Sequence, residues 1–247
     1  MLKFFRKIRQ KLLSENKFSN YLIYAIGEII LVVIGILIAL QINNWNEKRK
    51  EKAKTQAFYI QLLDDLKEDK AYAQFIIKKF ESQRAAYNSY LKQFDTNGVT
   101  RSKMYKDLLS LNSESYAINF NMSTLESLQN SGEIVLLPPG LRNSLLELKR
   151  SQEKITTDES LDNRAKTSVS EHLSILMGSP SLVERLNNQK DLKAELDIES
   201  NTNEIILALE SIQGWMDFSE LKSIRLLTDL LDEMDEVEKL IKKEIGK

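Results

Sequence analysis

Residues 21–40 form an apolar stretch in which Glu28 is the only charged residue. A helix of about 20 apolar residues is long enough to cross the hydrocarbon core of a bilayer. Aromatic residues, which favour the headgroup region, stand at both ends: Tyr21 and Tyr24 at the start and Trp45 after it. The stretch is longer than the apolar core of a cleaved signal peptide, and polar residues follow it where a small-residue cleavage site would lie. The sequence therefore predicts an uncleaved transmembrane helix over residues 21–45.

Basic residues flank this helix on both sides. Residues 1–20 contain six bases and one acid, Glu15, whereas five bases follow closely in residues 48–54, interspersed with Glu47 and Glu51. The first group leads the chain and is less diluted by acids, so the positive-inside tendency favours a cytoplasmic N-terminus. We therefore expect the large C-terminal part on the opposite, periplasmic side of the membrane rather than the reverse.

The first residues have a helical pattern of their own. Leu2, Phe5, Ile8 and Leu12 recur at spacings of three and four, with Lys and Arg between them. A helix of this kind lies in the membrane interface, with its apolar side in the lipid and its bases on the phosphates. Residues 1–20 are therefore predicted to be a basic amphipathic cytoplasmic segment that contacts membrane lipid. A plain positively charged flank explains the same composition.

Glu28 lies on a stripe of mostly small residues along the predicted transmembrane helix. Steps of three and four residues connect it with small side chains, and Gly35 and Ala39 form a pair that lets a second helix approach closely. We expect the Glu28 carboxyl to hydrogen-bond across a contact with another membrane protein or a second copy, because a carboxyl at membrane depth needs a partner. Alternatively, the Glu28 side chain reaches toward the headgroups or water. A proton path is a third reading, but it would need a second ionisable group in the helix, and there is none. The predicted contact stripe is Ala25, Glu28, Val32, Gly35, Ala39 and Asn43.

The rest of the chain has the pattern of helices. There are only three prolines and eight glycines, and apolar residues hold three- and four-residue spacings from Tyr59 to Phe94. A short helix is expected near residues 102–111, and longer ones over about 141–177 and 203–245. Ser123 and Glu126 have the spacing of a capping box, and Gly132 fits the position just after a helix. The predicted fold is all-α: the transmembrane helix continues into a long helix of an elongated antiparallel bundle, and residues 46–247 form a helical soluble domain.

Two segments resemble a known family. Residues 16–50, NKFSNYLIYAIGEIILVVIGILIALQINNWNEKRK, resemble the N-terminal signature of single-span membrane proteins abundant in Bacteroidota that form a family of unknown function (DUF6090). Residues 120–137, FNMSTLESLQNSGEIVLL, are similar to its second signature, which a Leu-Arg pair follows, here Leu141 and Arg142. Pro138 and Pro139 depart from the polar residue that relatives often have there. The resemblance implies a bacterial inner-membrane protein with one N-terminal span and a helical soluble region, and it implies no activity.

The sequence shows no recognisable catalytic motif. It has no cysteine and one histidine, His172, which we expect on the surface or flank of the bundle. The acid-rich residues 64–69 and 232–236 could hold a divalent cation, but lysines interleave with the first run, and we interpret both runs as solvated helix faces. The net charge is −1, and because the basic end holds much of the positive charge, the remainder is mildly acidic and unsuited to nucleic acid. We predict no catalytic, cofactor-binding or metal-binding residue.

The second signature supplies the remaining candidates for a contact. Thr124, Gly132 and Arg142 gather around a helix start and a turn, where they either cap the local structure or contact a partner or ligand. We therefore expect a membrane-anchored helical interaction or scaffold protein without catalytic activity. The alternative is a sensor or regulatory subunit that transmits a ligand or envelope signal through the long membrane-proximal helix. An enzyme that uses bundle carboxylates is a third hypothesis.

Overall fold

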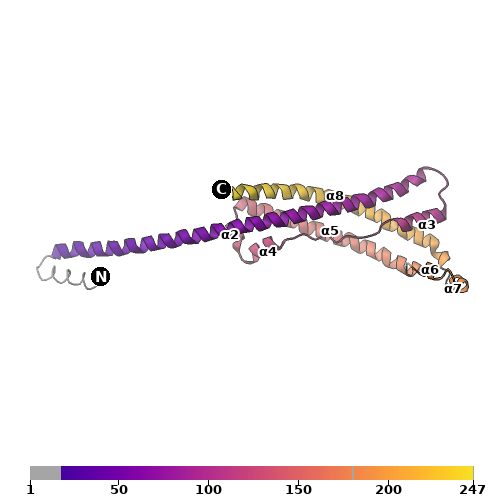
Figure 1. The fold of residues 1–247 in the computed structure, drawn as a ribbon, viewed down its shortest axis with the longest axis horizontal. Coiled ribbons are helices and arrows are strands. Elements are labelled where there is room, and N and C mark those ends of the chain that lie inside the picture. The colour runs from indigo at the N-terminus through magenta and orange to yellow at the C-terminus, as the bar shows by residue number, and fades with distance from the viewer. Residues whose placement is uncertain (1–17, 180, 247) are drawn as a thin grey trace. The chain divides into compact units, whose positions relative to one another are not determined.

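The chain folds into helices joined by short connections (Figure 1). The computed structural model describes residues 18–179 and 181–246. Within them no strand is present, which confirms the all-α prediction. The elements are α2 (Phe18–Leu91), η1 (Lys92–Asp95), α3 (Arg101–Ser110), α4 (Ser123–Asn130), η2 (Glu133–Leu136), α5 (Pro139–Met177), α6 (Leu182–Arg185), α7 (Lys190–Leu196), η3 (Ile198–Asn201) and α8 (Thr202–Ile245).

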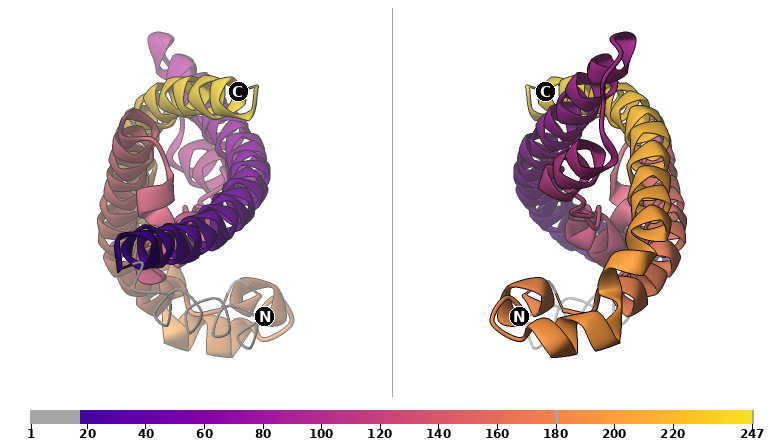
Figure 2. Two further views of the ribbon diagram at one scale, coloured as in Figure 1. Left: turned by 90° about the vertical axis from the view of Figure 1, so that its left-hand side faces the viewer. Right: turned by 90° about the vertical axis from the view of Figure 1, so that its right-hand side faces the viewer.

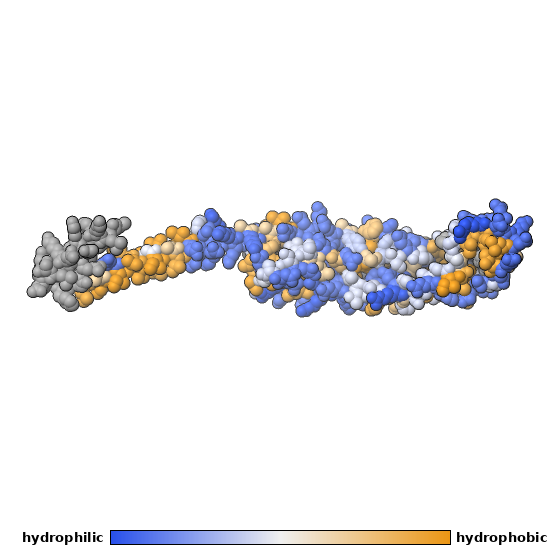
Figure 3. All heavy atoms as spheres, turned by 90° about the horizontal axis from the view of Figure 1, so that it is seen from below, coloured by the Kyte–Doolittle hydropathy of each residue, from blue (hydrophilic) through white to orange (hydrophobic). Residues whose placement is uncertain are grey.

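The chain divides into two compact units, Met1–Ala57 and Phe58–Lys247. The described part of the first unit is the beginning of α2, whose apolar side chains are exposed, with Leu31 at 67%. Among the described residues, α2 alone is long and apolar enough to cross a membrane. Figure 3 shows these side chains as an orange band beside the grey residues. The predicted amphipathic segment over residues 1–20 lies outside the described residues except for its last three positions, which begin α2.

In the second unit α8 runs antiparallel to α2. Near one end of the pair, the Nζ atom of Lys70 lies 2.5 Å from Oδ1 of Asp235. Farther along α2, the Nη1 atom of Arg84 lies 2.9 Å from Oδ1 of Asp217, which comes earlier on α8. Residue numbers rise along α2 while those of the paired residues on α8 fall, as expected for antiparallel helices.

The same argument makes α5 antiparallel to α8, and hence parallel to α2. Asp162 pairs with Lys222, and His172, later on α5, pairs with Glu204, earlier on α8. Residues 92–138 lead the chain back along the bundle before α5 begins. An antiparallel bundle is therefore confirmed for α8 against its two neighbours, while α2 and α5 run in the same direction.

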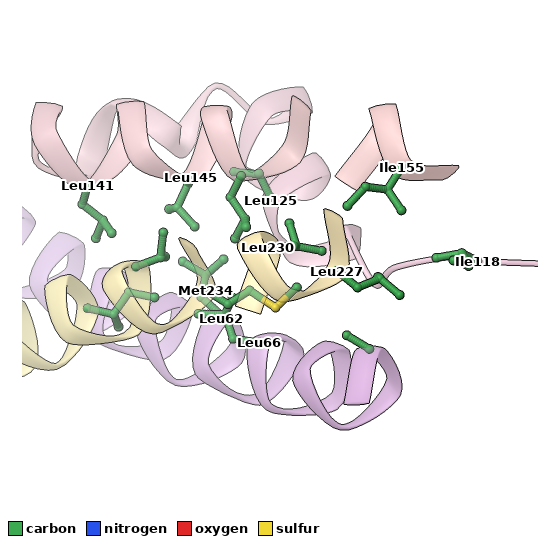
Figure 4. Close-up of a cluster of buried hydrophobic side chains, with 14 of the residues drawn as sticks. Leu62, Leu66, Ile118, Leu125, Leu141, Leu145, Ile155, Leu227, Leu230 and Met234 are labelled. Atoms are coloured by element: carbon green, nitrogen blue, oxygen red, sulfur yellow. The ribbon is translucent and has the colours of Figure 1, made fainter. Parts of the chain in front are cut away.

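The core lies where the three long helices meet. Figure 4 shows Leu141 and Leu145 of α5 facing Leu230 and Met234 of α8, with Leu62 of α2 beside them. These five side chains are each 3% exposed or less. Burying a large aliphatic side chain contributes about 1.5–3 kcal/mol to stability, so this cluster is a main reason why the amphipathic helices associate.

An extended segment, residues 112–122, lies against both α2 and α5. The hydroxyl of Tyr72 on α2 donates to the carbonyl oxygen of Ala117 at 2.7 Å. From α5, the amide nitrogen of Asn163 donates to the carbonyl oxygen of Tyr116 at 3.0 Å. The end-on views in Figure 2 show this part of the chain inside the arc formed by the long helices. Side chains thus satisfy backbone groups that would otherwise belong to a sheet or helix.

The start of α4 differs from the predicted capping box. Met122 is the N-cap residue, and its own side chain makes no capping hydrogen bond. Instead of capping α4, the hydroxyl of Ser123 donates to Oδ1 of Asn121 at 2.7 Å. The end of α4 is as predicted: Gly132 has φ of 74°. That left-handed conformation is one that glycine adopts without strain.

Candidate functional site

A cluster of buried charges follows the core along α5. Glu159 is 2% exposed and accepts a hydrogen bond of 2.7 Å from the hydroxyl of Ser223 on α8. The Nζ atom of Lys166 is 3.9 Å from Oε1 of Glu159, and both side chains are buried. Asp162, one turn from each, pairs with Lys222 of α8 at 2.6 Å. Burial raises the pKa of Glu159, while Ser223 and Lys166 partly oppose that change.

Glu220 of α8 belongs to the same charge cluster, which we define as Glu159, Asp162, Lys166, Glu220 and Ser223. It is 2% exposed, and its Oε1 atom has no hydrogen-bond partner among the described residues. Burial raises its pKa to about 8, although the positive charges of Lys166 and Arg84 act in the opposite direction. A carboxyl in such surroundings stays protonated near neutral pH because its charged form is poorly solvated.

Two carboxylates of α2 hold the beginning of α4. Asp69 is 4% exposed and accepts hydrogen bonds from the backbone N–H of Asn121 at 2.8 Å and from Nε2 of Gln152 at 2.8 Å. Asp65 accepts from the backbone N–H of Thr124 at 3.3 Å. Burial raises the pKa of Asp69 to about 6, and its two hydrogen bonds limit the rise. The predicted solvated acid face over residues 64–69 is thus wrong for Asp65 and Asp69, because they turn toward α4.

A polar groove lies between α5 and the extended segment. Its volume is about 360 Å³. Two residues that line it, Thr156 and Asn163, each have a buried polar atom without a hydrogen-bond partner among the described residues, Oγ1 and Oδ1 respectively. A buried polar group left unpaired costs roughly 1–3 kcal/mol, so each needs an explanation. We call this the polar groove; the side chains that give it its character are Asn119, Thr156, Ser160, Asn163, Arg164 and Thr167.

The outer side of α8 carries an exposed apolar face, which we define as Leu207, Trp215, Phe218 and Leu221. Their exposed fractions run from 42% at Trp215 to 69% at Leu207. The rings of Trp215 and Phe218 lie 6.2 Å apart, so the two side chains form one patch. Large apolar side chains that gather on a surface are typical of contact sites, whereas single ones are ordinary.

The predicted contact stripe lies along one helix, α2. Ala25 and Glu28 are half-buried, while Val32, Gly35, Ala39 and Asn43 are exposed. A Cβ atom added at Gly35 would meet no atom of another part of the described chain within 4 Å. The stripe is therefore accessible to another helix at Gly35, and the contact itself stays a prediction.

The three candidates from the second signature occupy separate places. Thr124 is half-buried, and its backbone N–H is bound by Asp65. Gly132 forms the turn after α4, and Arg142 is half-buried in the first turn of α5. None of the three lines the polar groove. His172 is on the surface, as predicted, where its Nε2 atom lies 2.9 Å from Glu204.

Comparison with known families matches the chain to one of them. The model of a family of unknown function, DUF6090, matches residues 28–171, more than half of the chain. The chain belongs to the DUF6090 family. The family resemblance seen in residues 16–50 and 120–137 is thereby confirmed, since the match begins within the first segment and includes the second. No curated protein and no solved structure matches the chain.

The DUF6090 match covers most of the sites described above, but not all. It includes Asp65 and Asp69, the polar groove and the α5 half of the charge cluster. It ends at residue 171, so Glu220, Ser223 and the apolar face of α8 lie outside it.

The charge cluster was not predicted from the sequence, although the residue pattern of α5 indicates it. The buried stripe of α5 continues through Gln152 and Ile155 to Glu159, Asp162 and Lys166 at the same alternation of three and four residues. Charged residues that replace apolar ones in register on a buried stripe indicate buried charges. The polar groove also had a signal, the short hydroxyl and amide side chains at helical spacing in the same part of α5.

Proposed function

We propose that this protein is a helical interaction protein anchored in the bacterial inner membrane, with its bundle in the periplasm and without catalytic activity. The observation that carries the proposal is the exposed apolar face of α8. Leu207, Trp215, Phe218 and Leu221 remain at least 42% exposed, although α8 buries its opposite side in the core. A second protein that covered this face would remove large apolar and aromatic surface from water, which is the main favourable term in association.

The exposed start of α2 supports the membrane anchor. Its apolar side chains have no protein to cover them in the described chain, and lipid is the environment that such a helix of this length fits. The contact stripe through Glu28 and Gly35 offers a second surface for a partner membrane protein or another copy. Trp45, with the guanidinium of Arg49 5.3 Å from its ring centre, fits a membrane interface.

Burial of the carboxyls supports a role other than catalysis. Glu159 and Glu220 are each 2% exposed, so a substrate has no access to them. The polar groove is lined by apolar, hydroxyl, amide and guanidinium groups, without the acid and base that proton transfer would use.

Capture of partners from native membranes tests this proposal. Membranes that contain the intact chain are crosslinked gently, solubilised and compared with those of the double variant Trp215→Ser, Phe218→Ser. The proposal expects a defined crosslinked species, either a partner or a second copy, that the double variant loses. Val135→Ser is the matched control, because Val135 is a single exposed apolar residue far from α8 in sequence. Equal capture by all three proteins, or no defined species with the intact chain, would contradict the proposal.

A second candidate function is a sensor or regulatory subunit. The polar groove favours it, since its volume of about 360 Å³ has room for a small molecule and its lining includes one charged side chain, that of Arg164. Saturable binding of a small molecule by the anchored chain would support it.

A further inference from the structure

The turns of α2 that directly follow its apolar stretch segregate their charges to two sides of the helix. Positions three and four residues apart lie on the same side. By this spacing one side, which we call the basic face, holds Trp45, Lys48, Arg49 and Lys52. The opposite side, which we call the mixed face, holds Glu47, Lys50, Glu51 and Lys54. The basic face thus contains three bases and no acid, whereas the acids and bases of the mixed face balance.

Contacts within the chain distinguish the two faces. On the mixed face, Nζ of Lys50 lies 3.7 Å from Oε1 of Glu47, so an acid of this chain already partners a base. On the basic face, Lys48 and Lys52 are exposed and form no ion pair with the described residues. Their positive charges are therefore left for a group outside the chain.

Arg49 and Trp45 contact each other on the basic face. The guanidinium of Arg49 lies 5.3 Å from the centre of the Trp45 ring, which keeps the charge beside the aromatic surface. Nη2 of Arg49 also donates to Oδ1 of Asn46 at 3.3 Å, a neutral partner. Because helical side chains lean toward the N-terminus of their helix, Arg49 points back toward the apolar stretch. Its charge is thus directed toward lipid and is not neutralised by an acid of this face.

The position of the basic face along α2 matches the headgroup layer of a bilayer. With residues 21–40 across the hydrocarbon core, Lys48 lies eight residues beyond it, which is about 12 Å of helix. The long side chain of a lysine reaches back over part of this distance. Trp45 lies between the core and Lys48, in the layer that tryptophan favours. Lys52 is one turn farther out, where the surface potential of anionic lipid still acts.

We propose that the basic face binds the headgroups of anionic phospholipids. Their phosphates pair with Lys48, Arg49 and Lys52, and the Trp45 ring lies among the headgroups. Bases that face the same headgroup layer add their attractions, whereas the cation of a zwitterionic headgroup offsets its phosphate. The inference goes beyond the proposed function by naming a lipid class. It rests on the membrane anchor and does not depend on which side of the membrane the bundle occupies.

Quenching of Trp45 fluorescence by brominated lipid tests the lipid class at this position. The full chain carries Trp215→Phe, which leaves Trp45 as the single tryptophan. It is reconstituted into bilayers of equal phosphatidylglycerol and phosphatidylcholine, with bromine on the acyl chains of one lipid or the other. Phosphatidylglycerol is expected to be preferred at least about threefold around Trp45. Equal quenching by the two lipids would overturn the proposal, whereas quenching by neither would contradict the membrane anchor itself.

Matched double variants test the basic face. Lys48→Gln with Lys52→Gln removes two charges from it, whereas Lys50→Gln with Lys54→Gln removes two charges from the mixed face of the same turns. The first pair is expected to reduce the preference for phosphatidylglycerol at least about twofold and the second to leave it unchanged. Equal reductions would mean that total charge alone matters, and they would overturn the assignment to the basic face.

Inorganic phosphate distinguishes a lipid headgroup from a free anion. When phosphate replaces chloride at equal ionic strength, the preference for phosphatidylglycerol is expected to stay the same. The reason is that headgroups are held beside the basic face at a high effective concentration. Loss of the preference in phosphate buffer would indicate a site for the free ion and would contradict the assignment to lipid.

Discussion

Glu220 is surrounded by charges from all three long helices. Arg84 of α2 and Lys166 of α5 favour its ionised form, whereas Glu159 of α5 and Asp217 of α8 oppose it. Burial outweighs these effects and raises the pKa of Glu220 to about 8. In the unfolded chain the same carboxyl ionises near its ordinary pKa of about 4.3. The folded and unfolded states therefore hold different numbers of protons between these two values.

This difference predicts a loss of stability as pH rises. Between about pH 5 and pH 8 the unfolded state binds fewer protons than the folded state, so the free energy of unfolding falls with increasing pH, by on the order of a few kcal/mol for Glu220 alone. Glu220→Gln removes this contribution, because glutamine does not titrate. Thermal denaturation of the detergent-solubilised chain at pH 5, 6, 7 and 8 should give a flatter profile for the variant than for the intact protein.

The exposed residue Glu147 provides the control for this measurement. Glu147→Gln changes the same chemical group on the surface of α5, so its profile should follow that of the intact chain. If the Glu220→Gln profile ran parallel to that of the intact chain, the account of Glu220 as a buried protonated carboxyl would be wrong.

At the scale of the element, α4 depends on a carboxylate from another helix. Asp65 of α2 accepts from the backbone N–H of Thr124, a group that would otherwise be one of the unpaired donors at a helix start. We predict that Asp65→Ala weakens this attachment by about 1 kcal/mol, the usual effect of losing a helix cap. Hydrogen exchange of the amides in residues 121–130 should then be roughly fivefold faster. Asp64→Ala, an adjacent exposed change, should leave exchange as it is; equal effects of both variants would contradict this role for Asp65.

Some elements of the fold could be predicted from the sequence, and others could not. The long helices could, because their apolar spacing is local information: α5 and α8 begin and end within two residues of the expected positions. The capping of α4 could not, since its acceptor Asp65 lies 59 residues before Thr124 and meets it only after folding. The parallel direction of α2 and α5 likewise depends on the path of residues 92–138. The polar groove could not be predicted either, because it forms between α5 and the extended segment, and no sequence pattern indicates that these two segments lie side by side.

At the scale of the whole molecule, the contact stripe of α2 predicts self-association or partner binding in the membrane. Gly35→Leu places a bulky side chain where a second helix would approach, and Glu28→Gln removes the charge that the carboxyl can carry. Both are expected to reduce the size of the crosslinked species in detergent. Gly27→Leu is the matched control, because Gly27 lies on α2 outside the stripe. Unchanged size and partners in the Glu28 and Gly35 variants would argue against a contact through this stripe.

The central claim is that α2 anchors the bundle on the periplasmic side of the membrane. Because the chain contains no cysteine, Ser89→Cys introduces a single thiol at an exposed position of α2 within the second unit. A membrane-impermeant maleimide applied to intact spheroplasts is the most direct measurement. We predict that the thiol is labelled before lysis and that the protein sediments with the membranes. Labelling only after lysis would contradict the topology, and recovery of the protein in the soluble fraction would contradict the anchor.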